Sequence, residues 1–182
     1  TLNRVMLPLE ERQLIVPSGI EESTGGRKPV LYDVNPGQYY TAGIDISRTY
    51  TQVVVVNLKT KIQCNLKFPM DESCSPGKTI DLIAEALNTL LKKSNIDTSM
   101  LLGVGLGTVG PLDRQKGLMF NPANFPAPGW TDVPIKSMLE EKLSLPVIID
   151  NGANTAVLAE FLFGHGRGCK NLAYFNCGVG IR

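Results

Sequence analysis

Cysteine and histidine, the residues most often used to bind metals, are few and scattered in this chain. The cysteines are Cys64, Cys74, Cys169 and Cys177, none of them forms a C-x-x-C pair, and His165 is the single histidine. Because a zinc site needs about four such ligands at close spacing, this pattern predicts no metal site. We expect reduced, partly buried thiols and a surface position for His165, as is typical of a cytosolic protein.

A second set of candidate functional residues could contact DNA. Thr1, Asn3 and Arg4 begin a helical pattern, and a recognition helix puts its first turns in the major groove. Arg27 and Lys28 follow two glycines in a polar loop, from which they could reach the minor groove or the phosphate backbone. Alternatively, this loop is a solvated hairpin that carries two charges.

The elements that would position these basic residues form the second half of a winged helix-turn-helix over residues 1–38. Apolar residues recur at helical spacing from Leu2 to Leu9, and Pro8 should kink this helix or end it early. In a winged helix, the loop between the next two strands is the wing. The predicted order after the helix is strand 14–16, turn 17–19, loop 21–28 and strand 29–34.

From residue 39 the pattern changes to alternating strands and helices. Three early strands followed by helix–strand alternation are typical of an actin-like ATPase (ribonuclease H-like) lobe. We therefore predict an α/β fold in which residues 39–182 form that lobe, truncated at its C-terminus. The predicted strands are 41–46, 51–58, 62–69, 101–106, 147–150 and 172–176, and the predicted helices are 76–94, 135–143 and 153–163.

The composition is that of a folded soluble protein. The chain has 182 residues, of which 43% are hydrophobic and 19% charged, and its net charge of +1 does not indicate any partner. No apolar run reaches the roughly 18 residues of a membrane span, and no signal peptide is visible. We therefore expect a cytoplasmic protein. Since both ends of the chain fall within structural patterns, we also expect it to be a fragment of a longer protein.

Five ordered segments resemble the ROK family, which groups bacterial repressors, open reading frames and sugar kinases. The likeness runs over nearly the whole chain, and the regulator branch that it resembles is that of the xylose-type repressors. Five segments in order are more specific than any one alone. They are ESTGGRKP at 22–29, GIDI at 43–46, GLGTVGPLD at 105–113, the loop 121–130 that ends in PGW, and PVIIDNGAN at 146–154.

The resemblance also shows where this chain departs from the kinases of the family. ROK kinases place an aspartate directly after an asparagine, where it takes the proton from the sugar hydroxyl during phosphoryl transfer. Gly152 occupies that position here, between Asn151 and Ala153, and glycine cannot accept a proton. Asp150 should point to the opposite face of its strand. The resemblance therefore implies that no catalytic residue remains.

The first phosphate loop departs as well. The kinases read Asp-Ile-Gly-Gly-Thr-Lys, and this chain reads DISRTY over residues 45–50. Glycines in such a loop let backbone N–H groups approach phosphates, which Ser47 and Arg48 should obstruct. Asp45, Ser47, Arg48 and Thr49 are thus the remnant of a phosphate loop, and we expect no ATP or magnesium unless the protein is an active kinase.

Sugar binding need not be lost with catalysis. By resemblance, Asn124 and Asn151 match positions that hydrogen-bond sugar hydroxyls, and Gly107 and Thr108 form a turn against the ligand. Alternatively, Asn124 is a turn residue and Asn151 caps a strand end. Trp130 is expected to anchor its loop by packing. The zinc-binding cluster of the family would lie beyond residue 182.

These expectations lead to one preferred function and two alternatives. The preferred function is a transcription regulator, a repressor of sugar metabolism, whose partners are operator DNA, a sugar or sugar-phosphate effector and further copies of itself in a homodimer or higher oligomer. The first alternative is an active ATP-dependent sugar kinase that uses a displaced carboxylate such as Asp150. The second is a sugar-binding protein with no DNA role.

Overall fold

The computed structural model, which describes residues 2–20 and 30–176, is built around a five-stranded mixed sheet. β3 pairs antiparallel with β4 and parallel with β6, and β9 is parallel to β6. The α/β class predicted for this part of the chain is confirmed. In spatial order the strands are β5 (Ile62–Pro69), β4 (Tyr50–Asn57), β3 (Tyr40–Ile46), β6 (Leu101–Thr108) and β9 (Val147–Asn151).

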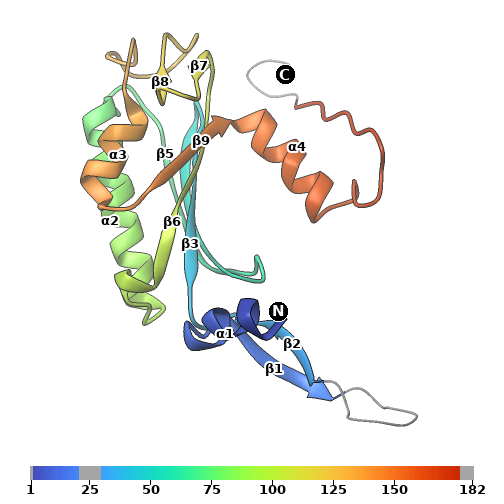
Figure 1. Ribbon diagram of the computed structural model, residues 1–182. Helices are drawn as coiled ribbons and strands as arrows, with labels where there is room; N and C mark the ends of the chain where they lie inside the picture. Colours follow the sequence, from blue (N-terminus) through green and yellow to red (C-terminus); the bar gives the residue numbers. More distant parts are fainter. Residues whose placement is uncertain (1, 21–29, 177–182) are drawn as a thin grey trace.

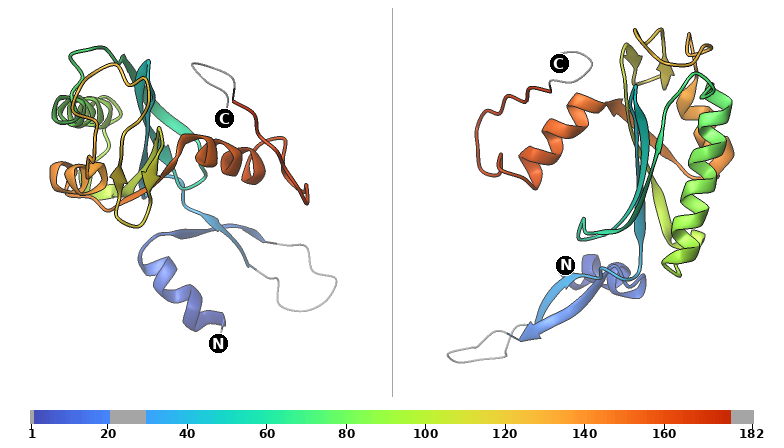
Figure 2. Two further views of the ribbon diagram at one scale, coloured as in Figure 1. Left: turned by 90° about the horizontal axis from the view of Figure 1, so that it is seen from above. Right: turned by 180° about the vertical axis from the view of Figure 1, so that it is seen from behind.

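Two helices, α2 (Pro76–Lys93) and α3 (Ile135–Leu143), cover one face of this sheet (Figure 2). Exposure alternates along β3 and β4, so every second side chain faces these helices. The apolar residues of α2 recur every three or four positions and are buried against the sheet. Lys142 of α3 also pairs with Asp81 of α2 at 2.6 Å at the surface between the two helices.

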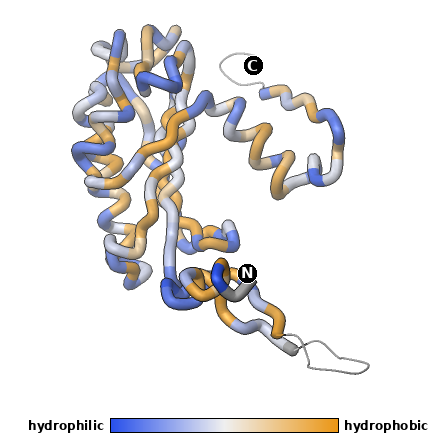
Figure 3. The backbone as a smooth tube through the Cα atoms, in the orientation of Figure 1, coloured by the Kyte–Doolittle hydropathy of each residue, from blue (hydrophilic) through white to orange (hydrophobic). Residues whose placement is uncertain are grey.

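The fourth helix, α4 (Gly152–Leu162), lies on the opposite side of the sheet (Figure 1). None of its described residues is buried, and Leu158 and Phe161 are 56% and 42% exposed. Figure 3 shows hydrophobic residues at several of its turns. The space between α4 and the sheet is therefore an open recess lined by both polar and apolar residues, and it is not a closed hydrophobic core.

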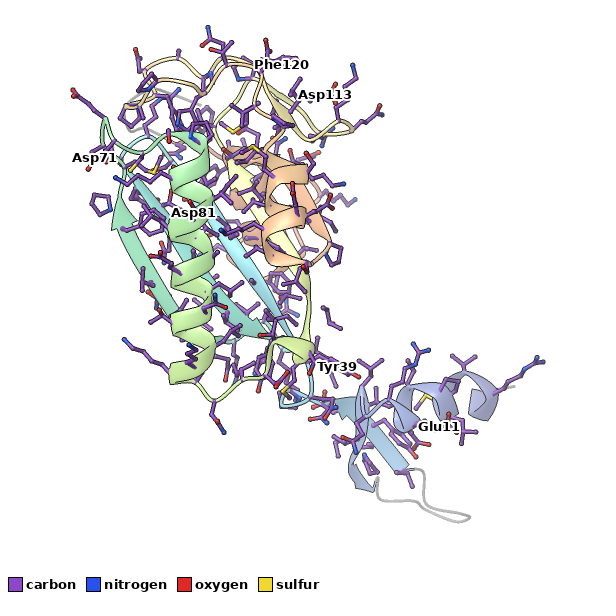
Figure 4. The ribbon with its side chains drawn as sticks, turned by 90° about the vertical axis from the view of Figure 1, so that its left-hand side faces the viewer. Glu11, Tyr39, Asp71, Asp81, Asp113 and Phe120 are labelled. Atoms are coloured by element: carbon purple, nitrogen blue, oxygen red, sulfur yellow. The ribbon has the colours of Figure 1, made fainter. Side chains whose placement is uncertain are left out.

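Residues 2–20 and 30–38 form a separate small unit at one end of the sheet. It consists of α1 (Leu2–Glu11) and a hairpin of β1 (Ile15–Ile20) and β2 (Val30–Val34). Tyr39, labelled in Figure 4, lies where this unit joins β3. The order of helix and two strands agrees with the sequence prediction, while the loop 21–29 lies outside the described residues.

Three local predictions are wrong in whole or in part. Of the two effects predicted for Pro8, a kink or an early end of the first helix, the early end does not occur: the helix continues to Glu11, because proline removes a single hydrogen-bond donor and the next turn still forms. The turn expected at residues 17–19 is a bulge inside β1. Leu172–Asn176 is not a strand, since it pairs with none of the described strands and every one of its residues is exposed.

Short elements complete the fold. A two-residue ladder of β7 (Leu112–Asp113) and β8 (Leu118–Met119) precedes the proline-rich loop, and a short 3₁₀ helix covers Thr98–Met100. Figure 4 labels Asp113 and Phe120 at this end of the sheet. Among the helices in the described ranges, none is both long and apolar enough to cross a membrane.

Candidate functional site

The three parallel strands bring the predicted site segments to one edge of the sheet. Ile46, Thr108 and Asn151 pair in one row, and the row before it contains Asp45, Gly107 and Asp150. Because parallel strands share the edge at which they end, segments far apart in the sequence meet there. This carboxyl edge is where open α/β sheets bind their ligands.

The turn between β3 and β4 is closed by hydrogen bonds of the Ser47 side chain. The Ser47 hydroxyl donates to the Tyr50 carbonyl oxygen at 2.9 Å and accepts hydrogen bonds from the backbone N–H groups of Tyr50 at 3.2 Å and Thr49 at 3.4 Å. In a phosphate loop these N–H groups would point to the ligand. Here Ser47 already occupies them, so the residues do not fit the triphosphate of ATP.

Arg48 ties this turn to the proline-rich loop. Its Nε donates to the carbonyl oxygen of Ala123 at 2.7 Å, next to Asn124. Asn124 itself is exposed and has a left-handed backbone with φ of 56°, which asparagine adopts more readily than most residues. The turn interpretation of Asn124 thus accounts for its conformation.

Asp45 is the acidic group at the centre of the site. Burial raises its pKa, whereas a hydrogen bond from the Tyr50 side chain and the positive charge of Lys67 act to lower it. The Lys67 ammonium lies 3.5 Å from the centre of the Tyr50 ring. The group that bonds Asp45 from β4 is thus a neutral hydroxyl, that of Tyr50.

Asn151 and Gly152 begin α4 beside this carboxylate. The side-chain oxygen of Asn151 accepts from the N–H of Ala153 at 3.0 Å, which makes Asn151 the N-cap of the helix. Gly110 leaves room for this side chain, because a Cβ there would lie 2.8 Å from the Asn151 amide nitrogen. A Cβ at Gly152 would lie 3.7 Å from the Asp45 carboxylate, so a side chain at this position would face the site.

Asp150, the carboxylate that the kinase alternative would use, is bonded to other groups of the protein. It accepts hydrogen bonds from Asn154 at 2.9 Å and from its neighbouring backbone N–H, and it pairs with Arg114 at 3.2 Å. Burial acts to raise its pKa, but these donors together lower it. A carboxylate stabilised as an anion in this way is a poor proton acceptor.

Two recesses adjoin the site. The Asp45 pocket, of about 460 Å³, is lined by thirteen described residues, among them Asp45, Ser47, Tyr50, Thr108, Gly152, Thr155, Tyr174 and Asn176. The sheet-face pocket, of about 880 Å³, lies between α4 and the open face of the sheet and includes Asp45, Gly107 and Asp150. Asp150 and Gly152 thus line different pockets.

The predicted sugar-binding residues are distributed unevenly around these pockets. Thr108 lines the Asp45 pocket and Gly107 the sheet-face pocket, whereas Asn124 and Asn151 line neither. Tyr50 and Tyr174 line the Asp45 pocket and were not singled out from the sequence. Tyr174 follows α4 and lies more than a hundred residues after Asp45 in the sequence. Only the tertiary structure therefore shows that the two residues line the same pocket.

The candidate DNA contacts lie at the other end of the molecule. Arg4 is an exposed residue of α1, and Asn3 belongs to the same helix. Thr1, Arg27 and Lys28 lie outside the described residues. Within residues 2–20 and 30–176, no three acidic, cysteine or histidine side chains gather closely enough to hold a metal ion. His165 is fully exposed, and Trp130 is buried with its ring against Phe125, as expected.

The shifted pKa of Asp45 predicts a pH-dependent effect of its removal. Because burial raises the pKa of this carboxyl from its ordinary value of 3.8, the folded protein binds that proton more readily than the unfolded chain does. Its favourable contribution is complete below pH 3.8 and is lost as the pH rises through the folded pKa. Asp45→Asn should therefore stabilise the fold at pH 7 more than at pH 3.5 in urea unfolding. An equal effect at both pH values would contradict the burial of this charge.

A mixed sheet with three parallel strands, α2 and α3 on one face, α4 on the other and a site at the carboxyl edge is the arrangement of the sugar-kinase and actin-like ATPase class. The sequence profile of the ROK family matches residues 41–181, and the chain belongs to this family. The resemblance noted in the sequence is therefore confirmed.

Individual relatives include both repressors and kinases. The xylose repressor of Caldicellulosiruptor bescii is 29% identical over 185 residues, which cover 100% of this chain and 45% of that protein. The glucokinase of Halalkalibacterium halodurans is 32% identical over 139 residues, which cover 76% of this chain and 41% of that protein. The chain thus spans about half the length of the curated relatives it matches.

Among solved structures, a ROK family transcriptional regulator described as a homologue of the E. coli MLC protein has a similar fold. Its TM-score is 0.70 at 14% sequence identity, and the match covers 91% of this chain and 42% of that one. At this identity the likeness concerns the fold alone.

Proposed function

We propose that this protein is a DNA-binding transcription regulator, a repressor of sugar metabolism, whose ROK lobe senses a sugar and has lost kinase activity. One observation carries the proposal. The xylose repressor aligns with 100% of this chain, whereas the glucokinase aligns with 76% of it and the ROK profile begins at residue 41. The N-terminal unit is therefore the part shared with the repressor.

The shape of the N-terminal unit supports the DNA role. Helix α1 packs on a two-stranded hairpin, which is the arrangement of a recognition helix and the strands that carry a wing. Arg4 is exposed on that helix and can reach a phosphate or a base edge. In a dimer, two such units would address two half-sites of an operator.

A continuous route connects the sugar lobe with this unit. Strand β3 begins next to Tyr39 and ends at Asp45 and Ile46, at the edge of the site. At the opposite end of β4 and β5, Lys59 pairs with Asp33 of β2 at 2.5 Å. A shift of the carboxyl edge on sugar binding would thus be transmitted along β3 to the orientation of the helix and hairpin.

Replacing Arg27 and Lys28 together by alanine tests the DNA role. If these residues contact phosphates in the wing, the double variant should bind operator DNA more weakly, and the slope of log K against log salt should flatten by about 1 to 2. Fluorescence anisotropy of labelled operator DNA across a salt series measures both quantities. Adding xylose to the complex would then test release by sugar.

The matched control removes two positive charges at the carboxyl edge of the sheet, the end away from the N-terminal unit. Lys78 in the first turn of α2 and Lys116 between β7 and β8 are both exposed, so their double alanine variant changes net charge equally. It should leave the slope unchanged. If the Arg27 and Lys28 variant has the same slope of log K against log salt as the native protein, the wing loses its support. If the native protein does not bind operator DNA, the regulator proposal is disproved.

The kinase alternative is favoured by one observation, the 32% identity to a glucokinase. Three features of the site oppose it. Gly152 stands at the position of the base, Ser47 occupies the N–H groups of the phosphate turn, and Asp150 is bound to Arg114. We therefore keep the regulator as the proposal.

A further inference from the structure

The N-terminal unit is joined to the lobe at two places. The first is the chain itself, because residues 35–39 lead from β2 into β3. The second is the ion pair between Asp33 of β2 and Lys59, at the tip of the β4–β5 hairpin, which Figure 1 shows beside this unit. Among the hydrogen bonds and ion pairs between described residues, no other one joins residues 2–20 and 30–34 to residues 40–176. A body held at one point can still rotate, so the ion pair restrains the orientation of the unit.

Both partners of the ion pair are positioned by the backbone around them. The side-chain oxygen of Asn57 accepts hydrogen bonds from the N–H groups of Lys59 and Lys61, each at 3.0 Å, and Asn57 is 8% exposed. These bonds fix the turn that carries Lys59. On the other side, the Asp33 carboxylate accepts from the N–H of Val34 at 2.7 Å. Because the turn and the carboxylate are already held, less conformational freedom is lost when the two charges meet.

Charge and exposure describe a contact that can open. The hydrogen bond from Lys59 lowers the pKa of Asp33 below its ordinary value, so this carboxylate is charged at neutral pH. The side chains of Lys59 and Asp33 are 37% and 48% exposed. Ion pairs as exposed as this one shift an equilibrium by only about 1.5- to 5-fold. The contact therefore favours one orientation of the unit and leaves others populated.

The same hairpin extends to the candidate site at its other end. β4 begins at Tyr50, whose hydroxyl bonds Asp45, and Lys67 of β5 lies over the Tyr50 ring. The two strands are paired over nearly their whole length. Because a rigid element carries a displacement from one end to the other, a movement of Tyr50 at the site reaches Lys59 at the tip.

We propose that the β4–β5 hairpin is a latch: the ion pair of Lys59 with Asp33 holds the N-terminal unit in one orientation on the lobe, and opening of the pair lets the unit rotate about residues 35–39. Lys59 is thus a residue of the lobe that positions α1. The latch itself requires no DNA. Its consequence, a fixed spacing between the two α1 helices of a dimer, rests on the proposed function.

Distances between spin labels in the complete protein test the latch. Labels on non-natural amino acids at Glu11 and Lys93, exposed residues that end α1 and α2, report the orientation of the unit by double electron–electron resonance. Excess unlabelled protein keeps each measured distance within one protomer. The native protein should show one dominant distance. In Lys59→Ala and in Asp33→Asn the population at this distance should fall about 1.5- to 5-fold relative to the other distances, and the double variant Lys59→Asp with Asp33→Lys should restore it.

The matched control is Lys61→Ala, because it removes the same charge from an exposed residue of the same turn. It should keep the native distribution of distances. The latch is contradicted if both single variants keep that distribution too, or if the double variant with exchanged charges does not restore it. A change in Lys61→Ala as large as that in Lys59→Ala would contradict it as well.

Operator binding by the same variants separates the latch from the regulator proposal. Lys59→Ala should bind operator DNA about 1.5- to 5-fold more weakly than Lys61→Ala, since both lack one positive charge and only the first loses the fixed orientation. Equal affinity of these two variants would refute the consequence for DNA. If the distances respond as expected and the native protein does not bind the operator, the regulator proposal fails while the latch stands.

Discussion

Replacing Gly152 by aspartate should leave the protein without measurable ATP turnover. The backbone has room for the side chain, because a Cβ at this position would lie 3.6 Å from the Thr108 carbonyl oxygen and 3.7 Å from Asp45. A general base is worth roughly 10²–10⁴-fold in rate, but only when the phosphoryl donor is bound. Ser47 still occupies the turn N–H groups, so we expect the phosphoryl donor not to bind.

The new carboxylate would also lie beside that of Asp45, and two such groups disfavour each other's ionisation. A coupled assay for ADP with magnesium, ATP and a panel of hexoses measures the outcome. Gly152→Asn is the matched control, because it has the same size and cannot act as the base. Turnover by the aspartate variant well above that of the asparagine variant would show that the phosphate turn is functional and that the kinase alternative deserves preference.

Truncating Trp130 to alanine should have the largest effect on stability. Trp130 is 3% exposed, its ring centre lies 4.5 Å from that of Phe125, and its indole N–H donates to the Cys74 carbonyl oxygen at 3.0 Å. The substitution leaves a large cavity and removes one of the two hydrogen bonds that the Cys74 carbonyl oxygen accepts, the other coming from the Thr79 hydroxyl at 3.3 Å. Comparable substitutions lower the free energy of unfolding by about 3–5 kcal/mol. Urea unfolding followed by far-ultraviolet circular dichroism measures this loss.

Two further variants separate packing from hydrogen bonding. Trp130→Phe keeps an aromatic ring near Phe125 but removes the N–H donor, so it should lose clearly less than the alanine variant. Thr131→Ala, at the exposed neighbouring position, should change stability by about 0.5 kcal/mol or less. A loss below about 1 kcal/mol in Trp130→Ala would mean that the loop does not depend on this anchor.

Most elements of the sheet and its helices follow from sequence periodicity. The four valines of β4 alternate between core and solvent, and α2 repeats apolar residues every three or four positions. The predictions for α2 and β5 therefore agree with the structure to within one residue, and that for α3 agrees at both ends. Such patterns are local, because one buried face imposes them on consecutive residues.

Errors occurred where a segment depends on a partner. Leu172–Asn176 has the composition of a strand, but a strand forms only where another strand offers its hydrogen bonds. The bulge at residues 17–19 likewise depends on the pairing of β1 with β2, although proline and glycine alone suggest a turn. Local residue types do not specify which distant backbone is available.

The sequence by itself determined the family and the α/β class, because these depend on residue identity and order. Only the tertiary structure decided that Ser47 bonds the N–H groups of the β3–β4 turn, that Asp150 and Gly152 line different pockets, and that Tyr174 lines the same pocket as Asp45. The physical reason is that hydrogen bonds and pocket walls join groups from strands and helices far apart in the chain. Their distances are set by sheet register and helix packing, which no short segment encodes.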